Sequence, residues 1–167
     1  MPSDTKPVFL WGAPGVGKTT VGRRLARTLG RPFVDTDALI VERAGMSIAS
    51  IFGQLGEPAF RALESEALAA AADNPGCVVS LGGGAVLAER NRALIAERGR
   101  SIHLRASIAT IERRLRAQRT ERPLLAAGIP VGTLLAQRLP FYELADHSID
   151  VDRRRLDDIV AEICALL

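Results

Sequence analysis

The chain has 167 residues, of which 47% are hydrophobic and 25% charged, so it has the length and composition of one soluble domain. This composition excludes disordered, collagen-like and coiled-coil proteins, and no apolar run approaches the roughly 18 residues that cross a bilayer. The net charge of +3 is too small to require nucleic acid as a partner, and five Phe, one Trp and one Tyr offer few rings for base stacking. We therefore expect a globular protein that binds neither nucleic acid nor a membrane.

The N-terminal segment and the cysteines indicate a compartment. Residues 1–7 are polar and contain no apolar signal core, so we expect no export. Cys77 and Cys164 lie in apolar stretches without CxxC spacing, and we expect both to be buried free thiols in a reducing cytoplasm. No repeat or linker divides the chain, which predicts one domain over residues 1–167.

Short apolar strands alternate with helical patterns along the chain. The predicted strands are residues 8–11, 33–34, 77–81, 101–104 and 147–151. Helical spacing follows the first glycines and recurs at residues 59–72, 88–97, 108–118, 131–144 and from about 156. This alternation predicts an α/β fold, a three-layer sandwich around a five-stranded, mostly parallel sheet. Ligands bind beyond the carboxyl ends of the strands in such sheets.

A phosphate-binding loop follows the first predicted strand. The run Gly12-Ala-Pro-Gly-Val-Gly-Lys18-Thr19 matches G-x-x-x-x-G-K-[ST] between a strand and a helix. Backbone N–H groups of such a loop surround phosphate oxygens, the lysine reaches the β- and γ-phosphates, and the hydroxyl ligates Mg²⁺. The alternative is a glycine-rich turn that matches by chance. We predict ATP and Mg²⁺ as cofactors, with the nucleotide held by Gly15, Val16, Gly17, Lys18, Thr19 and Thr20.

Lysine is scarce in this chain, which strengthens the interpretation of the loop. Among 22 basic residues only Lys6 and Lys18 are lysines. A lysine in the body of such a protein indicates a role that the larger arginine fork does not fill. We predict that Lys18 is catalytic.

Two acidic residues follow the second predicted strand. Asp35 and Asp37 are separated by one residue, so their carboxylates can point to the same side of an extended strand end. That arrangement suits metal ligation and acceptance of a hydroxyl proton. The alternative is that Thr36 or Asp37 caps a helix over residues 38–44.

The glycine triplet and the Arg61–Glu64 pair each allow a structural and a functional interpretation. Gly82, Gly83 and Gly84 either admit a ligand close to the backbone or form a flexible turn. Arg61 and Glu64 share a helix face, as a surface ion pair or with Glu64 orienting the guanidinium toward a substrate carboxylate.

The basic residues further along the chain also leave two interpretations open. The arginine-rich run 113–122 is either a solvated helix face or a lid over ATP. Arg138 precedes an aromatic pair, Phe141-Tyr142, and is either a surface residue or part of a basic site.

Together these residues resemble the shikimate kinase family of phosphate-loop kinases over about residues 8–163. The combination that carries the likeness is Asp35-Thr-Asp37, Gly56-x-x-x-Phe60-Arg61-x-x-Glu64, Gly82-Gly-Gly84, Arg122-Pro-Leu-Leu and Arg138-x-x-x-Tyr142. The resemblance implies a five-stranded parallel sheet and ATP-dependent phosphorylation of the 3-hydroxyl of shikimate. The product would be shikimate 3-phosphate, an intermediate of aromatic amino acid biosynthesis.

The resemblance also implies roles for individual residues. Asp35 would join Thr19 in the magnesium shell, and Asp37 would contact the substrate hydroxyls. The shikimate-binding residues would be Asp37, Arg61, Gly82, Gly83, Gly84 and Arg138, with both arginines on the carboxylate and Phe52 and Phe60 against the ring. Arg122 would be the catalytic lid arginine on ATP in a lid at about residues 113–127, and Arg119 and Arg153 would flank adenine.

The chain departs from the family pattern at two places. Only two residues separate Arg119 from Arg122, which predicts a less extensive lid closure, and Leu156 stands where a proline often opens the last helix.

Three alternative functions remain. They are a kinase of another polyol acid such as gluconate, a sensor of ATP or shikimate without turnover, and a basic nucleic-acid adaptor. The intact phosphate loop and aspartates favour a kinase, which we expect to be a cytoplasmic monomer.

Overall fold

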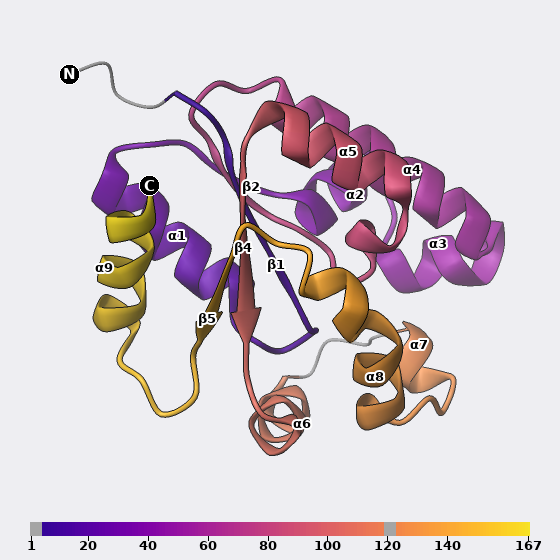
Figure 1. The fold of residues 1–167 in the computed structure, drawn as a ribbon. Helices are drawn as coiled ribbons and strands as arrows, with labels where there is room; N and C mark the ends of the chain where they lie inside the picture. The colour runs from indigo at the N-terminus through magenta and orange to yellow at the C-terminus, as the bar shows by residue number, and fades with distance from the viewer. Residues whose placement is uncertain (1–4, 119–122) are drawn as a thin grey trace.

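The computed structural model describes residues 5–118 and 123–167, and its centre is one five-stranded sheet (Figure 1). The strand order is β2-β3-β1-β4-β5 and every neighbouring pair is parallel. The strands are β1 (Val8–Gly12), β2 (Phe33–Asp35), β3 (Val78–Ser80), β4 (Arg100–Arg105) and β5 (His147–Asp150). The predicted parallel sheet is confirmed, and the observed strand ends differ from the predicted ones by at most one residue.

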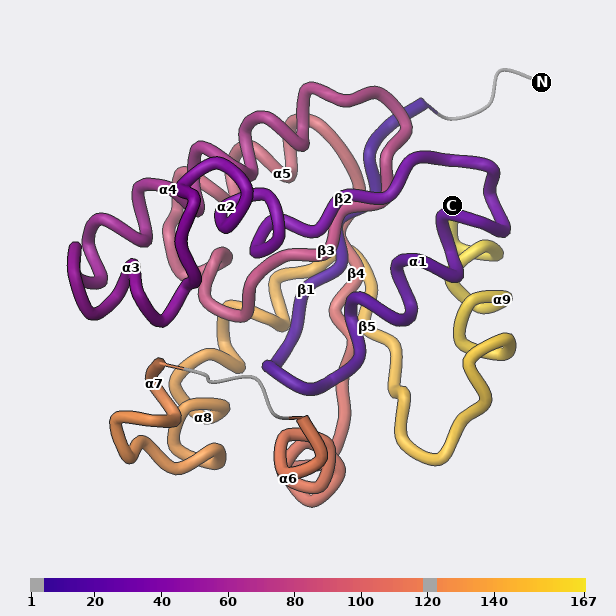
Figure 2. Tube along the Cα trace, turned by 180° about the vertical axis from the view of Figure 1, so that it is seen from behind, coloured from indigo at the N-terminus to yellow at the C-terminus, as the bar shows by residue number. Residues whose placement is uncertain are grey.

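Helices cover both faces of this sheet, which confirms the three-layer sandwich. They are α1 (Lys18–Leu29), α2 (Thr36–Ala44), α3 (Ile48–Leu55), α4 (Glu57–Ala72), α5 (Glu89–Arg98), α6 (Ile108–Ala117), α7 (Pro123–Ala126), α8 (Val131–Tyr142) and α9 (Leu156–Leu166). In Figures 1 and 2, α1 and α9 lie side by side on one face, and α4 and α5 lie on the other. The α6, α7 and α8 helices gather near the carboxyl ends of the strands.

Parallel strands covered on both faces are expected to be buried and largely apolar, and β1 and β3 follow this rule, with Ser80 at the end of β3 as the polar exception. All five residues of β1 and all three of β3 are buried. A smaller apolar cluster around Ile40, Ile51 and Phe60 holds α2, α3 and α4 together beside the main core. These three helices therefore form a unit of their own next to β2.

The α3 helix was not predicted, although its sequence carries the signals of a helix. The Ser47 hydroxyl oxygen accepts a hydrogen bond from the Ser50 N–H and caps the N-terminus. Ile48, Ile51 and Leu55 recur at helical spacing, and Gly56 ends the helix.

The predicted cap of α2 was wrong. The helix begins at Thr36 instead of residue 38, and its N-cap is Asp35, which precedes both predicted caps. Asp35 Oδ1 accepts hydrogen bonds from the N–H groups of Asp37 and Ala38 at 3.0 and 3.2 Å. The error arose because β2 runs into the helix without a connecting loop, so the last strand residue is also the cap.

Both cysteines are free thiols, as predicted, but only one is fully buried. Cys77 lies in the core and Cys164 is partly exposed. Among residues 5–118 and 123–167, none of the helices has the length and apolar content to cross a membrane.

A histidine is buried in the middle of the sheet. His103 on β4 is 3% exposed, its ring packs on that of Tyr142 at 5.3 Å, and its Nδ1 lies 3.3 Å from Ser148 Oγ. Burial lowers the pKa of His103 to about 4, and the positive charges of Arg105 and Lys18 contribute. The imidazole is therefore neutral in the folded protein at neutral pH.

This burial predicts a loss of stability in mild acid. Between pH 6.5 and 4 the unfolded chain binds a proton at His103 that the folded chain does not, so the free energy of unfolding falls as the pH falls. The full effect of His103 is about 3 kcal/mol. Urea denaturation of the wild type and of His103→Gln across this range measures it. If the free energy of unfolding changed equally with pH in the two proteins, the prediction would be contradicted.

Candidate active site

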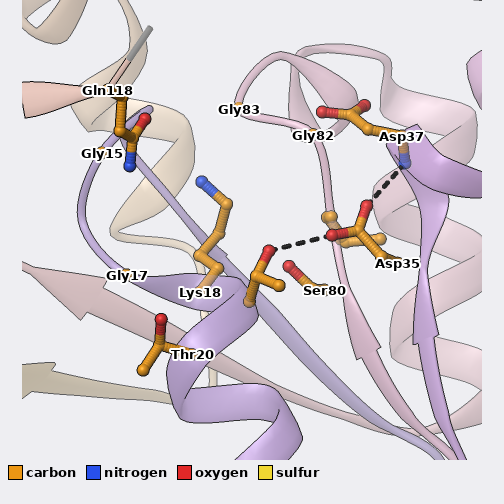
Figure 3. A pocket seen from close by; sticks show the side chains of 12 residues that line it. Gly15, Gly17, Lys18, Thr20, Asp35, Asp37, Ser80, Gly82, Gly83 and Gln118 are labelled. Carbon is orange, nitrogen blue, oxygen red and sulfur yellow. Dashed lines mark hydrogen bonds between the residues drawn. The ribbon is translucent and has the colours of Figure 1, made fainter. Parts of the chain in front are cut away.

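Three of the predicted motifs meet at the carboxyl ends of β1, β2 and β3. Figure 3 shows the phosphate loop facing the Asp35–Asp37 segment, with Gly82 and Gly83 between them. The residues line two adjoining cavities, which share Thr19, Asp35, Asp37, Gly82 and Gly83. The sheet edge predicted to bind ligands is therefore where the candidate residues converge.

The phosphate loop presents a positive end to this cavity. Gly17, at φ +105°, is the N-cap of α1, and among the described residues no side chain caps that helix. The first N–H groups of α1 are thus available to an anion. The ammonium of Lys18 donates hydrogen bonds to the carbonyl oxygens of Gly12 and Ala13, both at 2.9 Å. Figure 3 shows the Lys18 side chain extending into the cavity.

The α6 helix supports the loop from the other side. The guanidinium of Arg114 donates to the carbonyl oxygen of Val16 at 2.6 Å, and Leu115 packs against Gly15. Beside this contact lies a cavity of about 370 Å³, bounded by the phosphate loop, α6 and the β5–α9 connection. Arg114 was not identified from the sequence, because its solvated neighbours Arg113 and Arg116 give the same local pattern.

Some residues predicted to bind the nucleotide are not placed at the site. Arg153 is exposed, has a φ of +52° and is not among the residues that line the 370 Å³ cavity, whereas Arg154 is. Arg119 and Arg122 lie outside the described residues. Gln118, which ends α6, lines the cavity at the phosphate loop.

Asp35 has two functions at once. One carboxylate oxygen caps α2, while the other, Oδ2, accepts a hydrogen bond from the hydroxyl of Thr19 at 2.9 Å. Ser80, which was missed as a candidate, lies beside Asp35 in Figure 3 and lines the same cavity as Asp35 and Thr19. Carboxylate and hydroxyl oxygens suit Mg²⁺, so the residues present fit the predicted metal.

Thr36, between the two aspartates, faces the protein interior. Its hydroxyl donates to the carbonyl oxygen of Ser80 at 3.3 Å and accepts from the N–H of Gly82 at 3.2 Å. The side chain thereby joins the end of β2 to the glycine triplet. Asp35 and Asp37, on either side of Thr36 in the chain, both line the cavity.

Arg61 and Glu64 form a pair in which the carboxylate is buried and the guanidinium is half-buried, so the interpretation as a solvated surface ion pair does not describe it. Arg61 Nη1 lies 2.8 Å from Glu64 Oε1, and Glu64 is 2% exposed. Arg61 also contacts Glu57 at 3.2 Å. Burial raises the pKa of Glu64, and Arg61 opposes the rise. Burial alone would lower the pKa of Arg61, but the Glu64 and Glu57 carboxylates outweigh this effect. The pKa of Arg61 is therefore raised, and the guanidinium stays charged.

Arg138 is likewise no surface residue. It is 5% exposed and comes from α8, far along the chain from Arg61. Both arginines line a cavity of about 720 Å³, with the rings of Phe52 and Phe60 on its wall at a centroid separation of 4.7 Å. The cavity therefore offers two guanidinium groups and aromatic surface, which suits a small cyclic acid.

Each glycine of the triplet lies against a charged side chain. An added Cβ would lie 2.7 Å from Asp37 Oδ1 at Gly82, 3.0 Å from Arg138 Nη1 at Gly83 and 2.7 Å from Arg61 Nη2 at Gly84. No side chain fits at these positions unless a charged group moves. The triplet is therefore a close-packed floor beneath the charged groups, and the flexible-turn interpretation does not account for these contacts.

Comparison with protein families shows to which family the chain belongs. The family model described as shikimate kinase matches residues 14–167. The chain belongs to the shikimate kinase family. A shikimate kinase of Geobacter metallireducens is 44% identical over 99% of this chain and 94% of that protein. The structure of a shikimate kinase from Acinetobacter baumannii in complex with shikimate matches with a TM-score of 0.83 and 31% identity, over 96% of this chain and 92% of that one.

A kinase of gluconate, one of the alternative functions, is similar to this chain in fold alone. A gluconokinase from Sinorhizobium meliloti matches with a TM-score of 0.58 and 19% identity, over 97% of this chain and 91% of that one. The shikimate kinases therefore resemble this chain more closely in both sequence and structure.

Because Asp35 both caps α2 and carries a negative charge, two substitutions should separate the contribution of the cap to stability from that of the charge. Asp35→Ala removes the cap of α2 and lowers the free energy of unfolding by about 1 kcal/mol. Asp35→Asn keeps a capping oxygen without the charge, so its loss is less than about 0.5 kcal/mol. Urea denaturation of the three proteins measures the difference. Equal losses in both variants would mean that the carboxylate stabilises the fold through its charge.

Proposed function

We propose that this chain transfers the γ-phosphoryl group of ATP to the 3-hydroxyl of shikimate, giving shikimate 3-phosphate and ADP. The observation that carries the proposal is the convergence of Arg61 and Arg138 in an aromatic-walled cavity that adjoins a phosphate loop. Membership of the shikimate kinase family supports it.

The two arginines bind the carboxylate of shikimate in this proposal. They come from separate helices, α4 and α8, and each lies against a glycine of the triplet. Glu64 orients Arg61 through the 2.8 Å ion pair. A planar fork held in this way can form paired hydrogen bonds with a carboxylate. Phe52 and Phe60 offer apolar surface to the cyclohexene ring.

Transfer requires the acceptor hydroxyl and the phosphoryl group to meet between the two cavities. Asp37 lines both of them and would orient the 3-hydroxyl and accept its proton. The hydroxyl oxygen forms a bond to the γ-phosphorus as the bond to the β–γ bridging oxygen breaks. Lys18 would move from its backbone carbonyls to the phosphate oxygens and stabilise their charge. Arg122 is proposed to act on the same oxygens from the lid.

Thr19 and Asp35 would hold Mg²⁺. When bound, the ion neutralises charge on the phosphate oxygens. The proposal also includes a single domain that works as a monomer. A cytoplasmic location fits the two free thiols.

An assay of ADP release with shikimate, quinate and gluconate tests the proposed function. We expect turnover with shikimate well above that with the other two acids. Lys18→Ala should lower turnover about a hundredfold or more, because a main charge contact of the transition state is lost. Lys18→Arg should lower it too, because the larger fork does not fit between the carbonyls of Gly12 and Ala13.

Lys6→Ala is the matched control, since Lys6 is the other lysine and precedes the opposite end of β1. It should keep wild-type turnover. Preference for gluconate, or normal turnover in folded Lys18→Ala, would overturn the proposed function.

The glycine floor predicts a variant that damages substrate binding without unfolding the protein. In Gly84→Ala the added Cβ meets the movable end of the Arg61 side chain, so the guanidinium shifts while the backbone stays. Loss of one charge-assisted hydrogen bond of roughly 1.5–3 kcal/mol should weaken shikimate binding about tenfold or more. Calorimetry with ADP present measures this affinity.

Gly53→Ala is the control for the glycine variant, because an added Cβ there meets nothing within 4 Å. It should leave shikimate affinity unchanged. Equal affinities in Gly84→Ala and Gly53→Ala would show that Arg61 does not bind the acid.

A further inference from the structure

Tyr142 lies at the junction of three elements of the site. It is the last residue of α8 and is 1% exposed. Its ring packs on His103 of β4, and its backbone carbonyl accepts a hydrogen bond from Trp11 Nε1 at 2.9 Å. Trp11 directly precedes the phosphate loop. Packing and backbone contacts therefore fix the position of the ring independently of its hydroxyl.

The phenolic hydroxyl reaches the glycine triplet. It donates a hydrogen bond to the carbonyl oxygen of Gly83 at 2.6 Å. Burial raises the pKa of Tyr142, which keeps the hydroxyl protonated and able to donate. Because the phenol has one proton, its remaining capacity is to accept.

Arg138 lies beside that hydroxyl. It comes one helical turn before Tyr142 on α8, so the two side chains share a face. The charge of its guanidinium opposes the rise in the pKa of Tyr142. The same guanidinium packs against Gly83, where a Cβ would lie 3.0 Å from Nη1. Gly83 thus joins the two side chains, since its carbonyl oxygen accepts from the Tyr142 hydroxyl and its backbone lies against Arg138.

We propose that Tyr142 is a positioning residue for substrate, whose hydroxyl holds the Arg138 fork and the Gly83 backbone in the geometry that receives the acid. The proposal rests on the proposed function for the identity of that acid. Arg138 has no counterpart of Glu64 at ion-pair distance among the described residues. A neutral hydroxyl is its orienting partner, which leaves the full charge of Arg138 for the carboxylate.

Tyr142→Phe tests the proposal, because it deletes the hydroxyl and keeps the ring and the Trp11 contact. We expect shikimate affinity, measured by calorimetry with ADP present, to fall about tenfold while ADP affinity stays within twofold. In an Arg138→Lys background the same change should cost less than twofold, because the fork that the hydroxyl orients is already absent.

Ser101→Ala is the matched control. It removes another buried hydroxyl, which donates to Asp146 Oδ2 at 3.0 Å at the opposite end of β4. We expect a similar fall in Tm for Ser101→Ala and Tyr142→Phe, with shikimate affinity unchanged only in Ser101→Ala.

A readout without ligand separates this proposal from the proposed function. Solvent exchange of the Arg138 Nε–H, followed by NMR, should become at least tenfold faster in Tyr142→Phe and stay unchanged in Ser101→Ala. If wild-type protein does not bind shikimate, the proposed function is wrong. The exchange rates of the Arg138 Nε–H then test the role of Tyr142 without a ligand. Unchanged exchange, unchanged shikimate affinity or additive effects with Arg138→Lys would each overturn the positioning role.

Discussion

The ion pair between Arg61 and Glu64 joins a half-buried guanidinium to a buried carboxylate, and the acid-binding half of the molecule depends on it. A carboxylate as deeply buried as that of Glu64 is costly without a charged partner. Arg61, on the preceding turn of α4, supplies the opposite charge to Glu64, which is 2% exposed. The pair needs a floor without side chains and a wall that excludes water. The glycine triplet and the apolar cluster of α2, α3 and α4 provide these two features.

The two halves of the site are built by different means. The nucleotide half uses backbone groups at the start of α1, whose positions follow from the turn of the phosphate loop. The acid half uses side chains from α4 and α8, whose positions follow from packing between distant segments. Asp35 and Asp37 stand between the halves because β2 leads directly into α2.

This difference explains how much could be predicted from the sequence. The strands and the phosphate loop are local patterns, and their limits were predicted closely. The burial of Glu64 and Arg138 and the partial burial of Arg61 depend on tertiary packing, so spacing alone left each as surface residue or site residue. Ser80, Thr36 and Arg114 were missed for the same reason, since their roles arise from contacts across the sheet or between α6 and the phosphate loop. The α3 helix, in contrast, carried a readable cap and apolar spacing.

A floor made of glycine backbone limits how the specificity of this cavity can change. Gly82, Gly83 and Gly84 have no side chains to exchange, and any addition displaces a charged group that the site already uses. The opposite wall has no such constraint, because Val41, Ile48 and Ala49 of α2 and α3 line it with ordinary apolar side chains. Divergence toward a differently shaped acid, in nature or by engineering, would therefore proceed by substitutions on α2 and α3, over an unaltered floor.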